Sequence, residues 1–111
     1  MIEKIILNYL NSKLTVPVVM EEPADKPSSF VVIQKTGSSR VNYIFSATIA
    51  IQSYGESLLK AAELNEAVKN AMFGIPEVAE VASVRLNSDY NFTDSSTKKY
   101  RYQAVFEITH Y

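Results

Sequence analysis

The chain has 111 residues and a net charge of -1, with 47% hydrophobic and 21% charged residues. This length and composition predict one globular domain and exclude a disordered or collagen-like chain. Eleven basic residues balance twelve acidic ones, so no excess charge favours binding to nucleic-acid phosphates or anionic lipid. The absence of cysteine excludes a disulfide framework and a cysteine nucleophile, and a single histidine leaves little acid–base chemistry. We therefore expect no enzyme, no metal site and no cofactor.

The first ten residues are partly apolar, but Glu3, Lys4 and Asn8 interrupt them and no small-residue cleavage site follows. The longest apolar runs are about five residues, far below the roughly 20 that a membrane helix needs. We expect a soluble protein made in a cytoplasm.

The N-terminal third combines a helix, a short strand and a loop. Apolar residues at spacings of three and four predict a helix over about residues 2–12: Ile2, Ile5, Ile6, Tyr9 and Leu10. Residues 16–20 predict a strand, in which Pro17 requires an edge or strand-start position. Residues 21–29 contain two prolines and predict a surface loop. Because no histidine or third carboxylate accompanies Glu21 and Glu22 at helical spacing, we assign both to a solvated loop face.

Two strands follow and predict a long hairpin. Residues 30–35 are β-branched and apolar, 37–39 supply a turn, and 43–53 resume as a longer strand. Alternate residues of the second strand predict one buried face: Tyr43, Phe45, Ala47, Ile49 and Ile51. The tip of this hairpin is expected to carry Lys35 and Arg40.

The strongest helix lies between residues 53 and 74. Ser53 and Glu56 have the spacing of a capping box at its start. Its apolar stripe is formed by Leu58, Ala61, Leu64, Val68, Ala71 and Met72. Gly74 is expected to end the helix as its C′ residue, and Pro76 prevents continuation.

The last third predicts two strands and a loop. Residues 78–88 form a strand in which Val81, Ser83 and Arg85 oppose Ala82, Val84 and Leu86. Residues 87–97 form a loop, and 99–111 form the final strand. One face of that strand is apolar or aromatic: Tyr100, Tyr102, Ala104, Phe106 and Ile108. The order of elements predicts an α+β fold with an antiparallel or mixed sheet of about five strands, one main helix on one face and a short N-terminal helix.

Catalytic patterns are missing from the chain. There is no G-x-S-x-G sequence, and the three glycines at 37, 55 and 74 cannot form a phosphate-binding loop. Asp89 and Asp94 do not match an EF-hand, so we assign them to turn formation. His110 lies next to the end of the chain, where we expect it to face solvent.

Aromatic residues concentrate near the C-terminus. Six of the twelve Tyr and Phe residues fall in the last 22 positions, interleaved with Lys98, Lys99 and Arg101. This mixture can bind single-stranded nucleic acid by stacking. However, alternation along the last strand places its tyrosines and its basic residues on opposite faces, which favours a core face and a solvated face. Tyr90 and Phe92 fall in the predicted loop and favour a protein interface.

Three segments, in this order along the chain, carry a resemblance to a known family. After the first helix comes Pro27–Gly37 (PSSFVVIQKTG), and after the alanine-rich helix Asp89–Asp94 (DYNFTD) leads into Lys99–Phe106 (KYRYQAVF). From about residue 2 to 109 the chain resembles the small tail terminator and tail completion proteins of long-tailed bacteriophages and prophages. The loop-to-strand segment containing Arg101-Tyr102 is the most specific part of the resemblance.

The resemblance implies that residues 1–111 form a single tail-terminator-like domain without catalytic residues. It implies a homo-oligomeric ring, commonly of six subunits, that caps the tail tube, binds the head connector and lets DNA pass without sequence reading. It further implies assembly in the cytoplasm of a bacterial host, followed by a place at the head–tail junction of the virion. No charged cluster in the sequence marks a lumen.

We expect four residues to contact subunits or tail: Arg40 at the hairpin tip, and Tyr90, Phe92 and Asp94 in the long loop. Two other functions stay open. One is a head-closure or connector subunit of the same particle. The other, from a different class, is a small nucleic-acid- or ligand-binding module.

Overall fold

A computed structural model describes all 111 residues, and it confirms the α+β class. The strands form one five-stranded sheet in the order β1-β2-β3-β5-β4. Only β1 and β2 pair in parallel, and every other neighbouring pair is antiparallel. The elements are α1 (Ile2–Lys13), β1 (Val18–Val19), β2 (Phe30–Val41), β3 (Ile44–Gly55), α2 (Leu58–Met72), the 3₁₀ helix η1 (Ile75–Glu77), β4 (Val81–Asn91) and β5 (Tyr100–His110).

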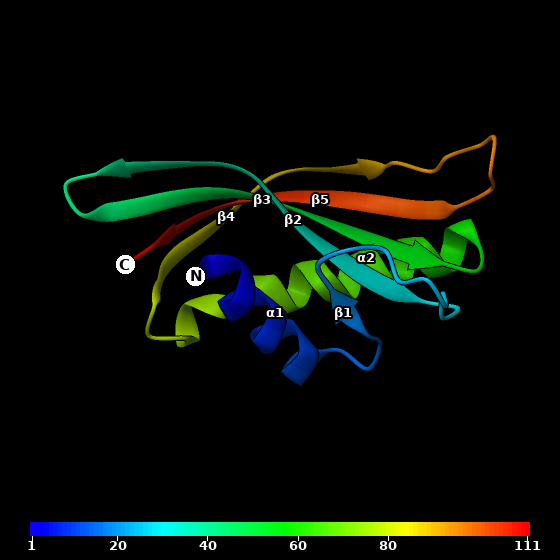
Figure 1. The fold of residues 1–111 in the computed structure, drawn as a ribbon, viewed down its shortest axis with the longest axis horizontal. Helices are drawn as coiled ribbons and strands as arrows, with labels where there is room; N and C mark the ends of the chain where they lie inside the picture. Colours follow the sequence, from blue (N-terminus) through cyan, green and yellow to red (C-terminus); the bar gives the residue numbers. More distant parts are fainter.

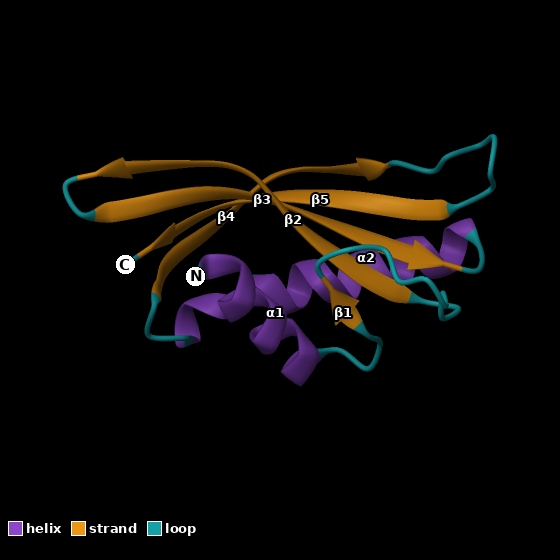
Figure 2. Cartoon of the chain, viewed as in Figure 1, coloured by secondary structure: helices purple, strands orange, loops and turns teal.

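The two helices lie on the same face of the sheet, and the opposite face carries no helix (Figure 2). Inward-facing side chains of the sheet and helices form one core: Ile6, Leu10, Val31, Ile33, Ile49, Ile51, Val68, Met72, Phe106 and Ile108. Each such side chain contributes about 1.5–3 kcal/mol when fully buried. The β2–β3 and β4–β5 hairpins extend beyond the helices at opposite ends of a molecule that measures 44 × 25 × 24 Å (Figure 1).

The first helix agrees with its prediction. Its buried residues are Ile2, Ile6, Tyr9 and Leu10, as the spacing indicated. The Tyr9 hydroxyl donates a 2.7 Å hydrogen bond to the carbonyl of Ala71, which ties α1 to the last turn of α2.

The strand expected over residues 16–20 is shorter, because only Val18 and Val19 pair with β2. Pro17 precedes it at the edge of the sheet, as its missing N–H requires. Asn11 on α1 binds both backbone groups of Val18, donating to its carbonyl and accepting from its N–H, each at 3.2 Å. This contact fixes β1 against the helix. The surface loop predicted for residues 21–29 is confirmed.

The predicted hairpin turn at residues 37–39 is wrong. Strand β2 runs through this segment, and a register shift between Lys35 and Gly37 absorbs the irregularity as a bulge. The chain instead reverses at Asn42 and Tyr43, whose φ angles of 51° and 69° belong to a two-residue hairpin turn.

Two expectations change with the position of this turn. Lys35 is not at the tip, and its ammonium group lies 3.6 Å from a carboxylate oxygen of Glu3 on α1. Tyr43 is not on the buried face, since 82% of its surface is exposed. Phe45, the next residue of the predicted face, is also exposed at 38%, whereas Ala47, Ile49 and Ile51 are buried as predicted.

The start of α2 also differs from its prediction. The capping residue is Ser57, whose hydroxyl accepts a 3.2 Å hydrogen bond from the Lys60 N–H, whereas Ser53 is fully buried in β3. Gly55 explains the sharp connection, because a Cβ there would lie 2.6 Å from the backbone nitrogen of Ala61. Of the apolar stripe predicted for α2, Ala61, Val68 and Met72 are buried, but Leu58 is exposed. The polar residue Asn65 is also buried on this face of the helix.

Gly74 directly follows the C-cap residue Phe73 and therefore occupies the predicted C′ position. Its φ is -92°, in the ordinary right-handed region, and η1 begins directly after it. A Cβ there would lie 2.9 Å from the Tyr9 hydroxyl oxygen, so a larger residue would displace that side chain.

The faces predicted for β4 are wrong at Val81 and Ala82, because the register shift at Val81/Ser83 interrupts the alternation, whereas Val84 and Leu86 share the face opposite Ser83 and Arg85 as predicted. As a result Val81, Val84 and Leu86 all pack toward the core. The strand continues to Asn91, so the predicted loop over residues 87–97 is wrong in its first half and Tyr90 is a strand residue. The faces of β5 are confirmed by the full burial of its inward-facing residues Ala104, Phe106 and Ile108.

Candidate functional site

Metal-ligating side chains do not cluster in this protein. No set of three or more His, Asp or Glu side chains is arranged so that it could hold a metal ion. His110 ends β5 and stacks on Phe45, with ring centroids 5.5 Å apart. Neither α-helix has the length and apolar character needed to cross a membrane. The features that stand out are the two hairpin ends and one hollow.

The first feature is the β2–β3 tip, which we define as residues 40–45. Its apolar side chains are exposed: Val41 67%, Tyr43 82%, Ile44 44% and Phe45 38%. The Arg40 guanidinium lies over the rings of Tyr43 and Phe45, 5.3 and 5.6 Å from their centroids. No carboxylate forms an ion pair with Arg40. The tip is therefore an exposed apolar patch with one unpaired positive charge.

The second feature is the β4–β5 end, where an arginine lies between aromatic rings. Arg101 lies 4.5 Å from the ring centroid of Phe92 and 5.7 Å from that of Tyr54. Its Nε donates to the Phe92 carbonyl at 2.7 Å, and its Nη1 donates to the Tyr54 hydroxyl at 2.9 Å. Tyr90 packs edge-on against Phe92, and Phe30 stacks on Tyr54 at 4.4 Å. These groups lie on or beside the sheet face that no helix covers.

The expected separation of basic and aromatic side chains on opposite faces of the sheet is incomplete. Alternation does separate the tyrosines of β5 from Arg101, but Tyr54 lies opposite Arg101 on the neighbouring strand. An aromatic residue and a basic residue therefore share one face. The pairing between strands, which determines this, is not visible in the pattern of a single strand.

Asp94 interacts with its own loop. Its carboxylate accepts hydrogen bonds from the backbone N–H and the hydroxyl of Ser96, at 3.1 and 2.7 Å. Hydrogen bonds from Ser96 and Thr97 hold the pKa of Asp94 below its usual value. Asp94 also forms an isolated bridge with Lys99, which closes the loop. These contacts are those of a turn-forming residue.

Loop residues 21–29 reach the same end of the molecule. The carboxylate of Glu22 accepts from Lys26 at 2.9 Å and from Lys99 at 3.0 Å. These two hydrogen bonds lower the pKa of Glu22. Lys99, one of the basic residues expected to be solvated, thus connects β5 to this loop.

The four residues selected from the sequence therefore fall into two groups. Tyr90 and Phe92 touch each other and belong with Asp94 to the β4–β5 hairpin, whereas Arg40 lies on the other hairpin, at the opposite end of the long axis (Figure 1). Sequence reasoning missed Val41, Tyr43 and Ile44, because it placed the turn at residues 37–39. The signal that could have found them is Asn42, since asparagine favours two-residue hairpin turns.

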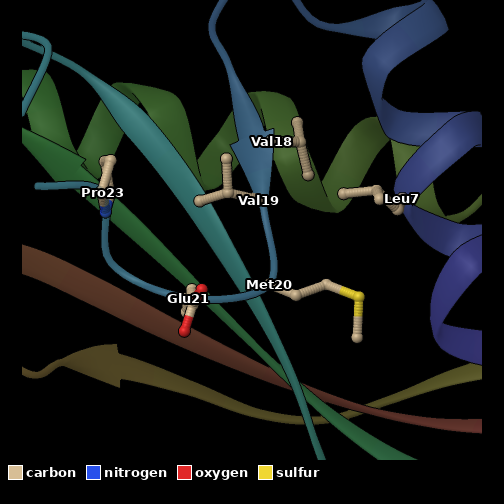
Figure 3. Close-up of a pocket in the computed structure, with 6 residues that line it drawn as sticks. All are labelled: Leu7, Val18, Val19, Met20, Glu21 and Pro23. Carbon is tan, nitrogen blue, oxygen red and sulfur yellow. The ribbon is translucent and has the colours of Figure 1, made fainter.

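The third feature, also missed, is a hollow beside β1 with a volume of about 560 Å³ (Figure 3). It is lined by Leu7 of α1, by Val18 and Val19 of β1, and by Met20, Glu21 and Pro23 of the following segment. The lining is apolar apart from Glu21, which forms no ion pair. The lining residues are 16 positions apart in sequence, so only the folded chain assembles them.

No protein-family model matches this chain, and no curated protein sequence matches it significantly. The function is therefore argued from the surfaces described above.

Proposed function

We propose that this protein is a structural assembly protein of a phage or prophage tail, a tail terminator that forms a ring, caps the tail tube and joins it to the head. The observation that supports this is the β2–β3 tip, where Val41, Tyr43 and Ile44 are exposed on a hairpin that extends beyond the helices. A contiguous exposed apolar patch is typical of a surface that another protein covers.

The overall shape agrees with a ring subunit. A closed ring needs two different surfaces on each subunit, so that each copy binds the next in the same direction. This chain has three different surface features in different places. They are the apolar β2–β3 tip, the β4–β5 end, where Arg101 is hydrogen-bonded among aromatic residues, and the hollow beside β1. The proposed ring is a hexamer, whose other partners are the tail tube protein and the head-connector protein.

The proposed mechanism is steric and requires no catalytic residue. Subunits bind the last ring of the tube and offer no further tube-like surface, so polymerisation stops. With a net charge of -1 the ring neither strongly attracts nor strongly repels the DNA that passes through it. Assembly takes place in the cytoplasm of the bacterial host, and the protein then stays at the head–tail junction.

Electron microscopy of the purified protein mixed with tail tubes tests the proposal. We expect rings at tube ends and loss of binding in a Tyr43→Asp variant, which places a charge on the exposed tip. A Leu59→Asp variant is the matched control, since Leu59 is 70% exposed in the first turn of α2, at the end of the molecule opposite the β2–β3 tip (Figure 1). A protein that neither forms rings nor binds tubes would exclude the function.

The same mixture separates the head-closure alternative, which predicts binding to DNA-filled heads and none to tubes. The nucleic-acid alternative has one observation in its favour, the guanidinium of Arg101 beside Phe92 and Tyr54. It predicts salt-dependent binding of an oligonucleotide that is lost when Lys99 and Arg101 are neutralised. Both side chains already have partners within the chain, which favours the assembly function.

A further inference from the structure

The β2–β3 tip and the hollow beside β1 have complementary properties. The tip is convex, apolar and carries the unpaired cation Arg40. The hollow is concave, apolar and carries the unpaired anion Glu21. They lie in different parts of the molecule, since the tip extends past one end of the sheet while β1 lies at its side edge below α2 (Figure 1). The tip and the hollow of one chain therefore do not contact each other.

The hollow is held open by contacts within the chain. Asn11 binds both backbone groups of Val18, and β2 pairs with Val18 and Val19 from the other side. The volume of about 560 Å³ lies in the range of about 300–1,000 Å³ that is usual for binding sites. Met20 is 43% exposed at the hollow, and its flexible thioether side chain can adapt to an incoming apolar group.

The tip carries a residue in an unfavourable backbone conformation. Tyr43 has a φ of 69°, in the left-handed region that aromatic residues rarely occupy. Glycine would suit that position best in a two-residue turn, yet the chain has tyrosine there, with 82% of its surface exposed. Such strain is often retained where a side chain is needed for contact.

The charges near the two features are also complementary. Arg40 has no acidic partner within its own chain. The loop that follows the hollow contains Glu21, Glu22 and Asp25 against a single Lys26. Glu22 is paired with Lys26 and Lys99, so Glu21 and Asp25 keep unpaired carboxylates.

Strand addition at the sheet edge is a less suitable way to join copies. The free edge at β4 is interrupted by two register shifts, and edge bulges of this kind prevent pairing with a further strand. The other edge consists of the two residues of β1 and, beyond them, of β2 from residue 33 to 41, where the bulge at Lys35/Gly37 interrupts the strand. Side-chain contacts between tip and hollow remain as the better route.

We propose that the β2–β3 tip of one copy seats in the hollow beside β1 of the next copy, with Tyr43 and Ile44 against the apolar lining and Arg40 paired with Glu21. The contact joins two different surfaces, so it repeats in one direction and closes into a ring. It rests on the proposed function, for which it names the contact between neighbouring subunits.

The absence of cysteine from the chain makes crosslinking a clean test. A mixture of the full-length Tyr43→Cys and Met20→Cys variants, treated with a short bifunctional maleimide, is expected to give a covalent dimer. Neither variant alone should give more than a minor fraction of that dimer, because a tip does not meet a tip. The matched control replaces Tyr43→Cys by Leu59→Cys, an equally exposed apolar position on α2.

A charge exchange tests the ion pair by sedimentation equilibrium. Arg40→Glu or Glu21→Arg alone is expected to weaken self-association more than about tenfold, because each places like charges together. The Arg40→Glu/Glu21→Arg double variant is expected to recover most of the association, which a general loss of folding would not allow. Circular dichroism of each variant verifies the fold.

Three results would overturn the proposal. The first is no dimer from the mixture at protein concentrations up to about 1 mM, where even weak association is populated. The second is self-crosslinking of Tyr43→Cys as efficient as the mixture. The third is crosslinking of Met20→Cys to tail tube protein and not to the tip.

If tubes are capped while the mixture fails to crosslink, the contact is wrong and the function stands. If the mixture crosslinks while tubes stay uncapped, the function is wrong.

Discussion

The two hairpin ends contain similar residue types but use them differently. At the β4–β5 end, Arg101 binds the Phe92 carbonyl and the Tyr54 hydroxyl, Lys99 binds Glu22, and Lys69 binds Asp89 at 2.6 Å. At the β2–β3 end, Arg40 has only aromatic neighbours and no carboxylate. An arginine among aromatic rings therefore stabilises the fold at one end, whereas at the other it is available to a partner. The difference lies in whether polar partners are supplied within the chain.

The largest effect on stability is expected at the β4–β5 end. Arg101→Ala removes two hydrogen bonds from a charged donor and a contact with two rings, and should lower the free energy of unfolding by about 1–2 kcal/mol. Urea unfolding followed by circular dichroism measures this loss. Arg85→Ala, at an exposed arginine of β4, is the control and should change it by less than about 0.5 kcal/mol. Equal effects of the two substitutions would remove the contrast between the ends.

Tyr43→Gly should change stability in the opposite direction. Glycine relieves the left-handed conformation of residue 43 and completes the Asn-Gly turn that hairpins favour, so we expect a gain of about 1 kcal/mol. The measurement is thermal unfolding at a concentration where the protein is monomeric, since association would itself add stability. The same variant should lose self-association. A stability loss instead would mean that the Tyr43 ring is needed within its own chain.

A smaller effect is expected for Arg40→Ala. This arginine makes only exposed contacts with aromatic rings, so its removal should lower the free energy of unfolding by about 0.5 kcal/mol. Self-association should fall much more than stability does. Urea unfolding and sedimentation of the same samples give both quantities, and a stability loss as large as that of Arg101→Ala would contradict the comparison.

The smallest effect concerns pH at the β4–β5 end. Hydrogen bonds from Lys26 and Lys99 lower the folded-state pKa of Glu22 below its ordinary value of 4.5. The stabilisation from Glu22 is therefore complete above pH 4.5 and is lost as the pH falls through the lowered folded-state value. Urea unfolding measured at a series of acidic pH values should show this loss of stability, and Glu22→Gln should remove it. An unchanged pH dependence in the Glu22→Gln variant would show that other groups cause the loss.

Much of the fold was predictable because apolar periodicity reflects burial directly. The stripe of α1 and the alternation of β5 correctly identified both elements and their buried faces. Errors occurred where a strand is irregular. The bulge next to Gly37 moved the hairpin turn by several residues, and the bulge at Val81/Ser83 placed Val81 and Ala82 on the faces opposite to those expected. A bulge depends on the partner strand, so the pattern of one strand does not predict it.

The candidate site shows the same limit. Arg40, Tyr90, Phe92 and Asp94 were selectable by residue type, but residue type does not say which polar groups are already bonded. Asp94 bonds to Ser96 and Arg101 bonds to Tyr54 across strands, and only the folded chain shows these contacts. The hollow was invisible in the sequence for the same reason, since α1, β1 and the next loop form it together.

By itself, the sequence determined a small, nearly neutral chain and predicted its two helices and its sheet. Those properties follow from the composition and from periodicity between residues a few positions apart. Neither depends on contacts between distant segments of the chain. The tertiary structure decided which exposed residues have partners inside the chain and which do not. That distinction depends on contacts between distant segments, such as Lys99 with Glu22, and it separates the bonded β4–β5 end from the unpaired β2–β3 tip.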